Sequence, residues 1–205
     1  LKKKKLNKLS LRDLAIKFEL QTNKNVGYQD QTFAAHGGFN FFKFKKKKLE
    51  IHKIRNQQNI NKLEKNLLMI YIRGNRDFNK IAKNINKNIE NSKNIRILNE
   101  IYNHANEGYR MIESENFKLK EFGQLFEESW QFKKKTSSKI SNLKVDALSQ
   151  RLIDLGAYGT KLFGVGGSGF MGVVCNKKIK EKILTEINLP IMQPKFYSKG
   201  SEQLL

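Results

Sequence analysis

The chain has 205 residues, of which 39% are hydrophobic and 29% charged, as is typical of a globular rather than a disordered protein. Its 40 Lys and Arg against 19 Asp and Glu give a net charge of +21, which would attract phosphorylated molecules, nucleic acid or anionic lipid. No apolar run reaches the roughly 20 residues of a membrane helix, and no apolar segment follows the first lysines as in a secretory signal. The sequence therefore predicts neither a membrane-embedded nor a secreted protein.

Most of the excess charge is lysine, with runs at residues 2–5, 45–48 and 133–135. Dispersed lysines of this kind favour a solvated surface over a dedicated polyanion site. Cys175 is the only cysteine, so an internal disulfide is impossible and a reducing, cytoplasmic setting is expected. Because the chain starts at Leu1 rather than Met, we expect a fragment or a processed product.

The first third of the chain alternates between helical and extended patterns. Apolar spacing predicts a helix over residues 11–20, and Ser10 with Asp13 three residues later has capping-box spacing at its start. Residues 25–36 are expected to form a loop that leads into two strands at 37–45 and 49–54. The polar stretch 56–62 reads as a break between domains, and the apolar run 66–72 predicts a strand buried on both faces.

The middle of the chain is helical in pattern and its end is mixed. Apolar residues keep helical spacing within 98–112, 119–126 and 148–155, and Gly156 is expected to end the last of these helices. A strand, a glycine-rich loop and a second strand follow, and then a helix at 177–187 and a closing strand at 191–197. Strands, then helices, then strands predict the α+β class.

Four of the chain's 14 glycines fall between Gly164 and Gly169, where G-x-G-x-x-G is satisfied. The dinucleotide-binding interpretation fails, because "FMGVVC" after the loop is strand-like and no helix opens there to bind a pyrophosphate. A P-loop fails as well, since no Gly-Lys-Ser/Thr closes the segment. Two interpretations remain: a tight hairpin whose glycines supply positive φ, or a loop that lies flat against a phosphate or a neighbouring domain.

Two acidic residues near the N-terminus are candidates for a shared site. Asp30 lies within "GYQDQ", and Glu19 precedes it on the predicted helix. A short loop could fold Asp30 back toward the end of that helix, where one carboxylate would suit Mg²⁺ and the other a substrate hydroxyl. The alternatives are an ordinary solvated turn for Asp30 and an ordinary helix surface for Glu19.

Taken in order, "GYQDQ", "GGFNFFKF", "YIRGNRDFNKI", "ESWQFKKKTSSKISN" and "GTKLFGVGGSGF" resemble the GHMP kinase superfamily, and within it the D-glycero-D-manno-heptose 7-phosphate kinase branch. The resemblance runs from about Leu9 to Gly200. It implies an α+β, GHMP-kinase-like fold. Residues 1–58 would end an N-terminal α/β catalytic domain, and residues 59–205 would form a ferredoxin-like C-terminal domain with an antiparallel sheet and helices.

The resemblance also implies an ATP-dependent kinase that phosphorylates the anomeric hydroxyl of a heptose 7-phosphate with the help of Mg²⁺. Asp30 would be the catalytic carboxylate and Glu19 the magnesium ligand. The phosphate loop would comprise Gly164, Gly166, Gly167, Ser168 and Gly169. The sugar phosphate would contact Tyr28, Gln29, Gln31, Arg76 and Lys161.

The chain departs from the family pattern at several points. The loop that cradles the ATP phosphates in the family is absent from this sequence, Ser168 stands where many relatives have glycine, and Arg73 stands where the branch usually has threonine. We therefore expect the chain to be inactive without a preceding segment. Two alternatives stay open: an inactive remnant of a truncated GHMP kinase, and a basic RNA-binding module built on the aromatic and lysine residues of 37–48. Neither a nucleic acid nor a membrane is the expected partner.

Overall fold

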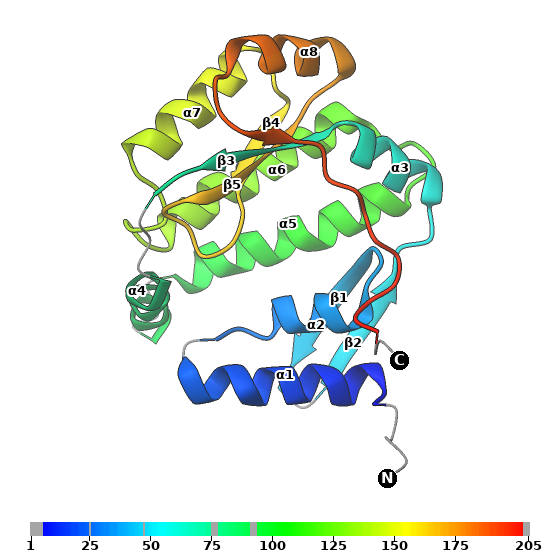
Figure 1. The fold of residues 1–205 in the computed structure, drawn as a ribbon, viewed down its shortest axis with the longest axis vertical. Coiled ribbons are helices and arrows are strands. Elements are labelled where there is room, and N and C mark those ends of the chain that lie inside the picture. The colour runs from blue at the N-terminus through cyan, green and yellow to red at the C-terminus, as the bar shows by residue number, and fades with distance from the viewer. Residues whose placement is uncertain (1–5, 25, 47, 75–77, 91–93, 203–205) are drawn as a thin grey trace. The chain divides into compact units, whose positions relative to one another are not determined.

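The structure is a computed structural model that describes residues 6–24, 26–46, 48–74, 78–90 and 94–202 (Figure 1). The chain divides into two compact units, one of residues 1–54 with 195–205 and the other of residues 55–194. We call these unit 1 and unit 2. The domain boundary expected at residue 58 stays a prediction.

Unit 1 contains α1 (Lys8–Thr22), α2 (Gln29–His36) and an antiparallel hairpin of β1 (Asn40–Lys45) and β2 (Lys48–Lys53). Helix α1 begins earlier than predicted. The side chain of Asn7 accepts a hydrogen bond of 2.8 Å from the backbone N–H of Ser10, so Asn7 is the N-cap. The expected capping box of Ser10 and Asp13 is therefore wrong. The side-chain oxygen of Asn7 already accepts from a backbone N–H of the first turn that has no partner within the helix.

The segment around Asp30 was expected to be a loop, and this expectation is wrong: it forms helix α2. Its buried residues are Gln31, Thr32 and Ala35, so polar side chains face the interior and no apolar periodicity marks the helix. The hydroxyl of Thr32 donates to the carbonyl of Tyr28, one turn earlier. Gly37, at φ 65°, ends the helix with a backbone conformation that favours glycine.

The C-terminal segment returns to unit 1. The backbone N–H of Ser201 donates to Ala34 O at 2.7 Å, and that of Gly38 donates to Tyr197 O at 2.9 Å. The closing strand expected over 191–197 is limited to β6 (Ile191–Met192), because the chain beyond it leaves the sheet of unit 2 for these contacts.

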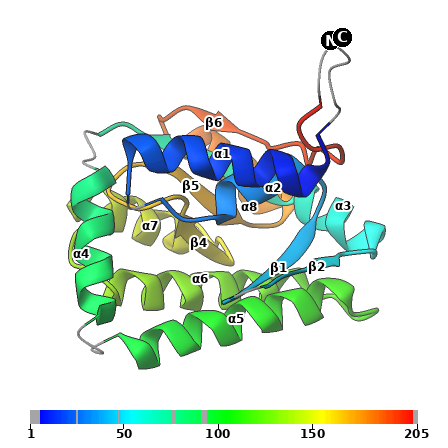
Figure 2. The ribbon, with the colours of Figure 1, turned by 90° about the horizontal axis from the view of Figure 1, so that it is seen from below.

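Unit 2 has a four-stranded sheet in the order β4 (Gly159–Leu162), β5 (Gly169–Val174), β3 (Leu67–Ile72), β6. All three neighbouring pairs are antiparallel. Its helices are α3 (Gln57–Lys65), α4 (Phe78–Glu90), α5 (Ile95–Glu113), α6 (Leu119–Lys135), α7 (Leu143–Asp154) and α8 (Lys177–Glu186). Helix α6 packs on β4 and β5, and α5 lies alongside α6 (Figure 2). The predicted α+β class is confirmed.

The polar stretch 56–62 was expected to be a break, but Asn56 is the N-cap of helix α3 and residues 57–62 form its first turns. Ile60 and Leu63 lie on its buried face together with Asn59. The Asn59 amide donates to Ile112 O at 2.8 Å and Ser114 O at 2.7 Å, the carbonyls at the end of α5. The helix is thus held by tertiary contacts that satisfy another helix's last carbonyls, which a local pattern does not reveal.

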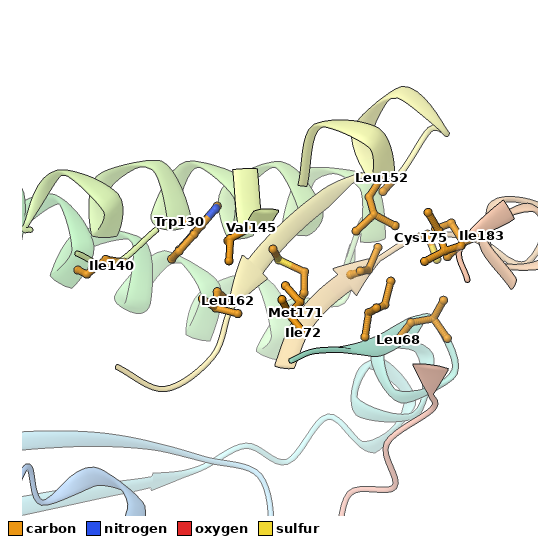
Figure 3. Packing of buried hydrophobic residues seen from close by; sticks show 14 of the residues in the cluster. Leu68, Ile72, Trp130, Ile140, Val145, Leu152, Leu162, Met171, Cys175 and Ile183 are labelled. Carbon is orange, nitrogen blue, oxygen red and sulfur yellow. The ribbon is translucent and has the colours of Figure 1, made fainter. Parts of the chain in front are cut away.

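The core of unit 2 lies between the sheet and its helices (Figure 3). Trp130 of α6, Met171 of β5 and Leu152 of α7 are fully buried there. Each such side chain contributes about 1.5–3 kcal/mol relative to exposure. Gly156, at φ 103°, follows the last turn of α7 as the sequence predicted. None of the helices in the described ranges has the length and apolar character needed to cross a membrane.

Candidate active site

In unit 1, the two predicted carboxylates lie on neighbouring helices. Glu19 is near the end of α1, and Asp30 is in the first turn of α2, which packs against α1. The side-chain N–H of Gln31 donates to the Glu19 carboxylate, so Glu19 is tied to the residue directly after Asp30. Both carboxylate residues are exposed.

The three residues around Asp30 that were predicted to contact sugar differ in exposure. Tyr28 is 53% exposed and Gln29 is also exposed, whereas Gln31 is buried. Among the described residues, the carbonyl oxygen of the Gln31 side chain has no hydrogen-bond partner. The observed contact of Gln31 is with Glu19, and it fixes the direction of that carboxylate.

In unit 2, the glycine loop joins β4 to β5. Gly164, Gly166, Gly167 and Gly169 have φ of 75°, 113°, 79° and 115°, values that favour glycine. A Cβ on Gly166 would lie 2.6 Å from Ile140 O. The N–H of Gly167 donates to the same oxygen at 2.8 Å, and the Asn142 amide donates to Gly167 O at 2.7 Å. At Gly166 the close approach is therefore made by the chain's own backbone.

Ser168 is accommodated within the loop. It is 4% exposed, and its hydroxyl donates to Gly74 O at 3.2 Å. Gly74 in turn lies so close that a Cβ on it would be 3.0 Å from the Cβ of Ser168. Arg76 lies outside the described residues, so its predicted phosphate contact stays a prediction. Arg73 is exposed.

Lys161, on β4 beside the loop, is half-buried against α6. Its Nζ donates to Ser129 Oγ at 2.6 Å and lies 5.6 Å from the centre of the Phe126 ring. Burial lowers the pKa of Lys161 to about 8. A lysine in this position supplies a positive charge close to the glycine loop.

Lys133 was expected to be part of a solvated lysine run, and this expectation is wrong. Its Nζ donates to Gly164 O at 2.5 Å and to Leu162 O at 3.3 Å, which ties α6 to the start of the loop. Burial, followed by the charge of Lys161, lowers the pKa of Lys133 to about 8. The sequence held a signal for this, since Lys133 follows the buried Trp130 by three residues and so shares its helix face.

The aromatic residues of the hairpin in unit 1 are used in packing. Phe42 makes an edge-on contact with Phe33 at 4.5 Å between ring centres, and Phe39 lies 5.0 Å from Phe196. Phe39, just before β1, and Phe42, within it, are half-buried, whereas Phe44 is 46% exposed. Phe39 and Phe42 are thus committed to contacts within unit 1.

Among the described residues, no group of three or more His, Cys, Asp or Glu side chains is placed to hold a metal ion. Mg²⁺ in phosphate-transferring enzymes is commonly held by one or two carboxylates together with substrate phosphates and waters. The exposed carboxylate of Glu19 fits that donor set.

Comparison with known proteins gives one curated relative and many structural neighbours. No protein-family profile matches the chain. A D-glycero-alpha-D-manno-heptose 7-phosphate kinase from Campylobacter jejuni is 29% identical over 156 residues, which cover 71% of this chain and 43% of the relative. A D-glycero-D-manno-heptose 1-phosphate kinase from Bacteroides thetaiotaomicron matches 95% of this chain and 54% of its own length, with a TM-score of 0.67 and 21% identity. A mevalonate kinase matches 96% of this chain and 59% of its own length, with a TM-score of 0.67 and 19% identity.

The chain thus spans about half the length of the proteins that it matches. Its fold is that of the GHMP kinases, and the similarity to this superfamily that the sequence motifs indicated is confirmed.

Proposed function

We propose that this chain forms part of an ATP-dependent sugar-phosphate kinase that transfers the γ-phosphoryl group to the anomeric hydroxyl of a heptose 7-phosphate. The GHMP-kinase fold and the similarity to a heptose 7-phosphate kinase support a phosphotransferase. Because the chain spans about half of that relative, the activity belongs to a protein in which the ATP-phosphate loop is also present. We place residues 1–58 in the catalytic domain and 59–205 in the C-terminal domain of a cytoplasmic enzyme.

The observation that carries the proposal is the hydrogen bond from Gln31 to Glu19. It links Glu19 to the residue directly after Asp30 in the first turn of α2, as a two-carboxylate site requires. Without this link, two exposed acidic residues on separate helices would have no reason to act together.

Asp30 is the proposed catalytic carboxylate. It would accept a hydrogen bond from the anomeric hydroxyl, orient that oxygen toward the γ-phosphorus, and take up its proton as the bond to phosphorus forms. The bond to the leaving ADP oxygen breaks in the same step. Phosphoryl transfer depends mainly on positioning and charge neutralisation, so an exposed carboxylate of this kind is sufficient.

Glu19 is the proposed magnesium ligand, held in one direction by Gln31. When bound, Mg²⁺ would neutralise charge on the ATP phosphates. Tyr28 and Gln29, both exposed beside Asp30, would donate hydrogen bonds to sugar hydroxyls or accept hydrogen bonds from them.

The glycine loop and the basic residues beside it would receive the phosphate groups. Gly164, Gly166, Gly167, Ser168 and Gly169 form a rigid turn resting on Ile140 and Asn142. Backbone that is already held in place would bind a phosphate with little ordering cost. Lys161 and Arg76 would contact the 7-phosphate.

The test is turnover by the chain joined to the part of the Campylobacter relative that this chain does not match. We expect ADP release that depends on heptose 7-phosphate. Asp30→Asn should lower kcat about 100-fold or more, as removal of a positioned proton acceptor does. Asp13→Asn, at another exposed acidic residue of unit 1, is the matched control and should leave kcat unchanged.

Circular dichroism of each variant shows whether the fold is kept. No ADP release by the folded parent fusion, or equal kcat in the parent and Asp30→Asn, would refute the proposal.

A further inference from the structure

We infer that Lys133 and Lys161 form a two-lysine binding site for a tetrahedral oxyanion beside the glycine loop. That its natural occupant is a phosphate group of the substrate or the nucleotide rests on the proposed function. The anion site itself rests on the geometry and charge of unit 2.

The two lysines approach the start of the loop from α6 and from β4. Lys133 Nζ bridges Leu162 O and Gly164 O, the carbonyls on either side of Phe163. Lys161 Nζ donates to Ser129 Oγ, and Ser129 precedes Lys133 by four residues on α6. Residues four apart share one helix face, so both ammonium groups lie on the same side of α6.

No carboxylate among the described residues forms an ion pair with either lysine. The next lysine, Lys134, does have such a partner, Asp146, at 3.1 Å. On α6 itself, the Glu127 carboxylate accepts hydrogen bonds from the N–H and hydroxyl of Thr160, at 2.7 and 2.8 Å. Glu128 faces His104 at 3.8 Å. The acidic groups of this helix are therefore engaged elsewhere.

Two half-buried ammonium groups without a counter-charge are costly, because burial withdraws water from each charge. Burial lowers the pKa of both lysines, and the charge of Lys161 lowers that of Lys133 further. An oxyanion bound between them would remove this cost and would raise both pKa values.

The lysines also have donors to offer. An ammonium group has three N–H donors. Toward the described residues Lys133 uses two of them and Lys161 one. A tetrahedral oxyanion can accept the remaining donors from two directions at once. Charge and hydrogen-bonding capacity thus point to the same class of ligand.

The test measures thermal unfolding of the chain at pH 7 with increasing sulfate, against chloride at matched ionic strength. The chloride series corrects for general screening of the net charge of +21. We expect sulfate to raise Tm saturably beyond chloride. In Lys133→Met and in Lys161→Met the apparent affinity for sulfate should fall by about tenfold or more, because each change removes one of the two charges that bind the anion.

Lys135→Met is the matched control, since it removes one charge from an exposed position of the same run. It should keep the wild-type response. An equal sulfate response in all variants, or none beyond chloride in the wild type, would overturn the inference.

If the Met variants do not fold, NMR of isotope-labelled lysine side chains in the wild type replaces them. Sulfate should then raise the pKa of two lysines from about 8. Unchanged lysine pKa values at saturating sulfate would count against the site.

Sulfate binding needs neither ATP nor sugar, so the test of the anion site and the test of the kinase proposal can fail independently. Sulfate-specific binding that depends on both lysines, with no turnover by the joined chain, would keep the anion site and refute the kinase. Turnover without such binding would refute the anion site alone.

Discussion

Replacing Gly166 by alanine tests whether the glycine loop is fixed by its own backbone. Gly166 has φ 113°, and an added Cβ would lie 2.6 Å from Ile140 O and 2.8 Å from Ile140 Cα. Both neighbours are backbone atoms, so no side chain can rotate away. The loop and the segment at Ile140 must separate to make room.

The expected cost follows from two contributions. A non-glycine residue in this φ region costs about 1–3 kcal/mol. Separation also breaks the hydrogen bond from Gly167 N–H to Ile140 O, a loss of about 0.5–1.5 kcal/mol. Together they predict that Gly166→Ala lowers the free energy of unfolding by about 1.5–4.5 kcal/mol.

The assay is urea unfolding followed by circular dichroism, with the free energy extrapolated to water. The control is Gly108→Ala on α5, where the added Cβ would meet Phe122 at an ordinary 3.7 Å. Because alanine favours a helix interior over glycine, we expect this change to stabilise by about 0.5–1 kcal/mol. If Gly166→Ala unfolds within about 0.5 kcal/mol of the wild type, the loop does not rest on Ile140 as described.

Three further predictions concern single side chains. The pKa values of Lys133 and Lys161 are lowered in the folded state, so unfolding takes up protons and stability should rise with pH from about 8 to about 10.5. Urea unfolding across this range should show a flatter slope in Lys133→Met and in Lys161→Met than in the wild type, and equal slopes would contradict the shifts. Cys175 is buried, and burial raises the pKa of its thiol to about 11. A thiol reagent at pH 8 should therefore label it only as fast as the protein unfolds, and immediate labelling of the native chain would contradict this prediction. In the joined, active chain, Gln31→Leu removes the hydrogen bond that holds Glu19. The magnesium concentration needed for half-maximal turnover should then rise several-fold, and an unchanged concentration would show that this hydrogen bond does not orient a magnesium ligand.

The long elements could be predicted because apolar residues recur at one spacing. β3 and helices α6, α7 and α8 each bury a face in the core of unit 2, and a buried face requires apolar residues at a regular spacing in the sequence. Helix α2 left no such trace. It is short and buries the polar residues Gln31 and Thr32. It is held by the hydrogen bond from Gln31 to Glu19 of α1 and by the hydrogen bond from the Thr32 hydroxyl to its own first turn, and neither contact produces an apolar period.

The residues of the candidate site also differ in how well the sequence predicted them. The glycines and acidic residues stood out by type and clustering, and the structure gives them defined positions within their units. Lys133 did not stand out, because a lysine in a run of three looks solvated until the direction of the helix is known. Its neighbours Lys134 and Lys135 differ from it only in which side of α6 they occupy, one paired with Asp146 and the other exposed.

The most direct test of the kinase proposal is phosphorus NMR of the joined chain incubated with ATP, Mg²⁺ and heptose 7-phosphate. The account predicts a new phosphate signal on the anomeric carbon, equal in amount to the ADP formed, and its loss in a folded Asp30→Asn variant. ATP hydrolysis to free phosphate without a sugar product, or an anomeric phosphate that forms equally well without the Asp30 carboxylate, would contradict it.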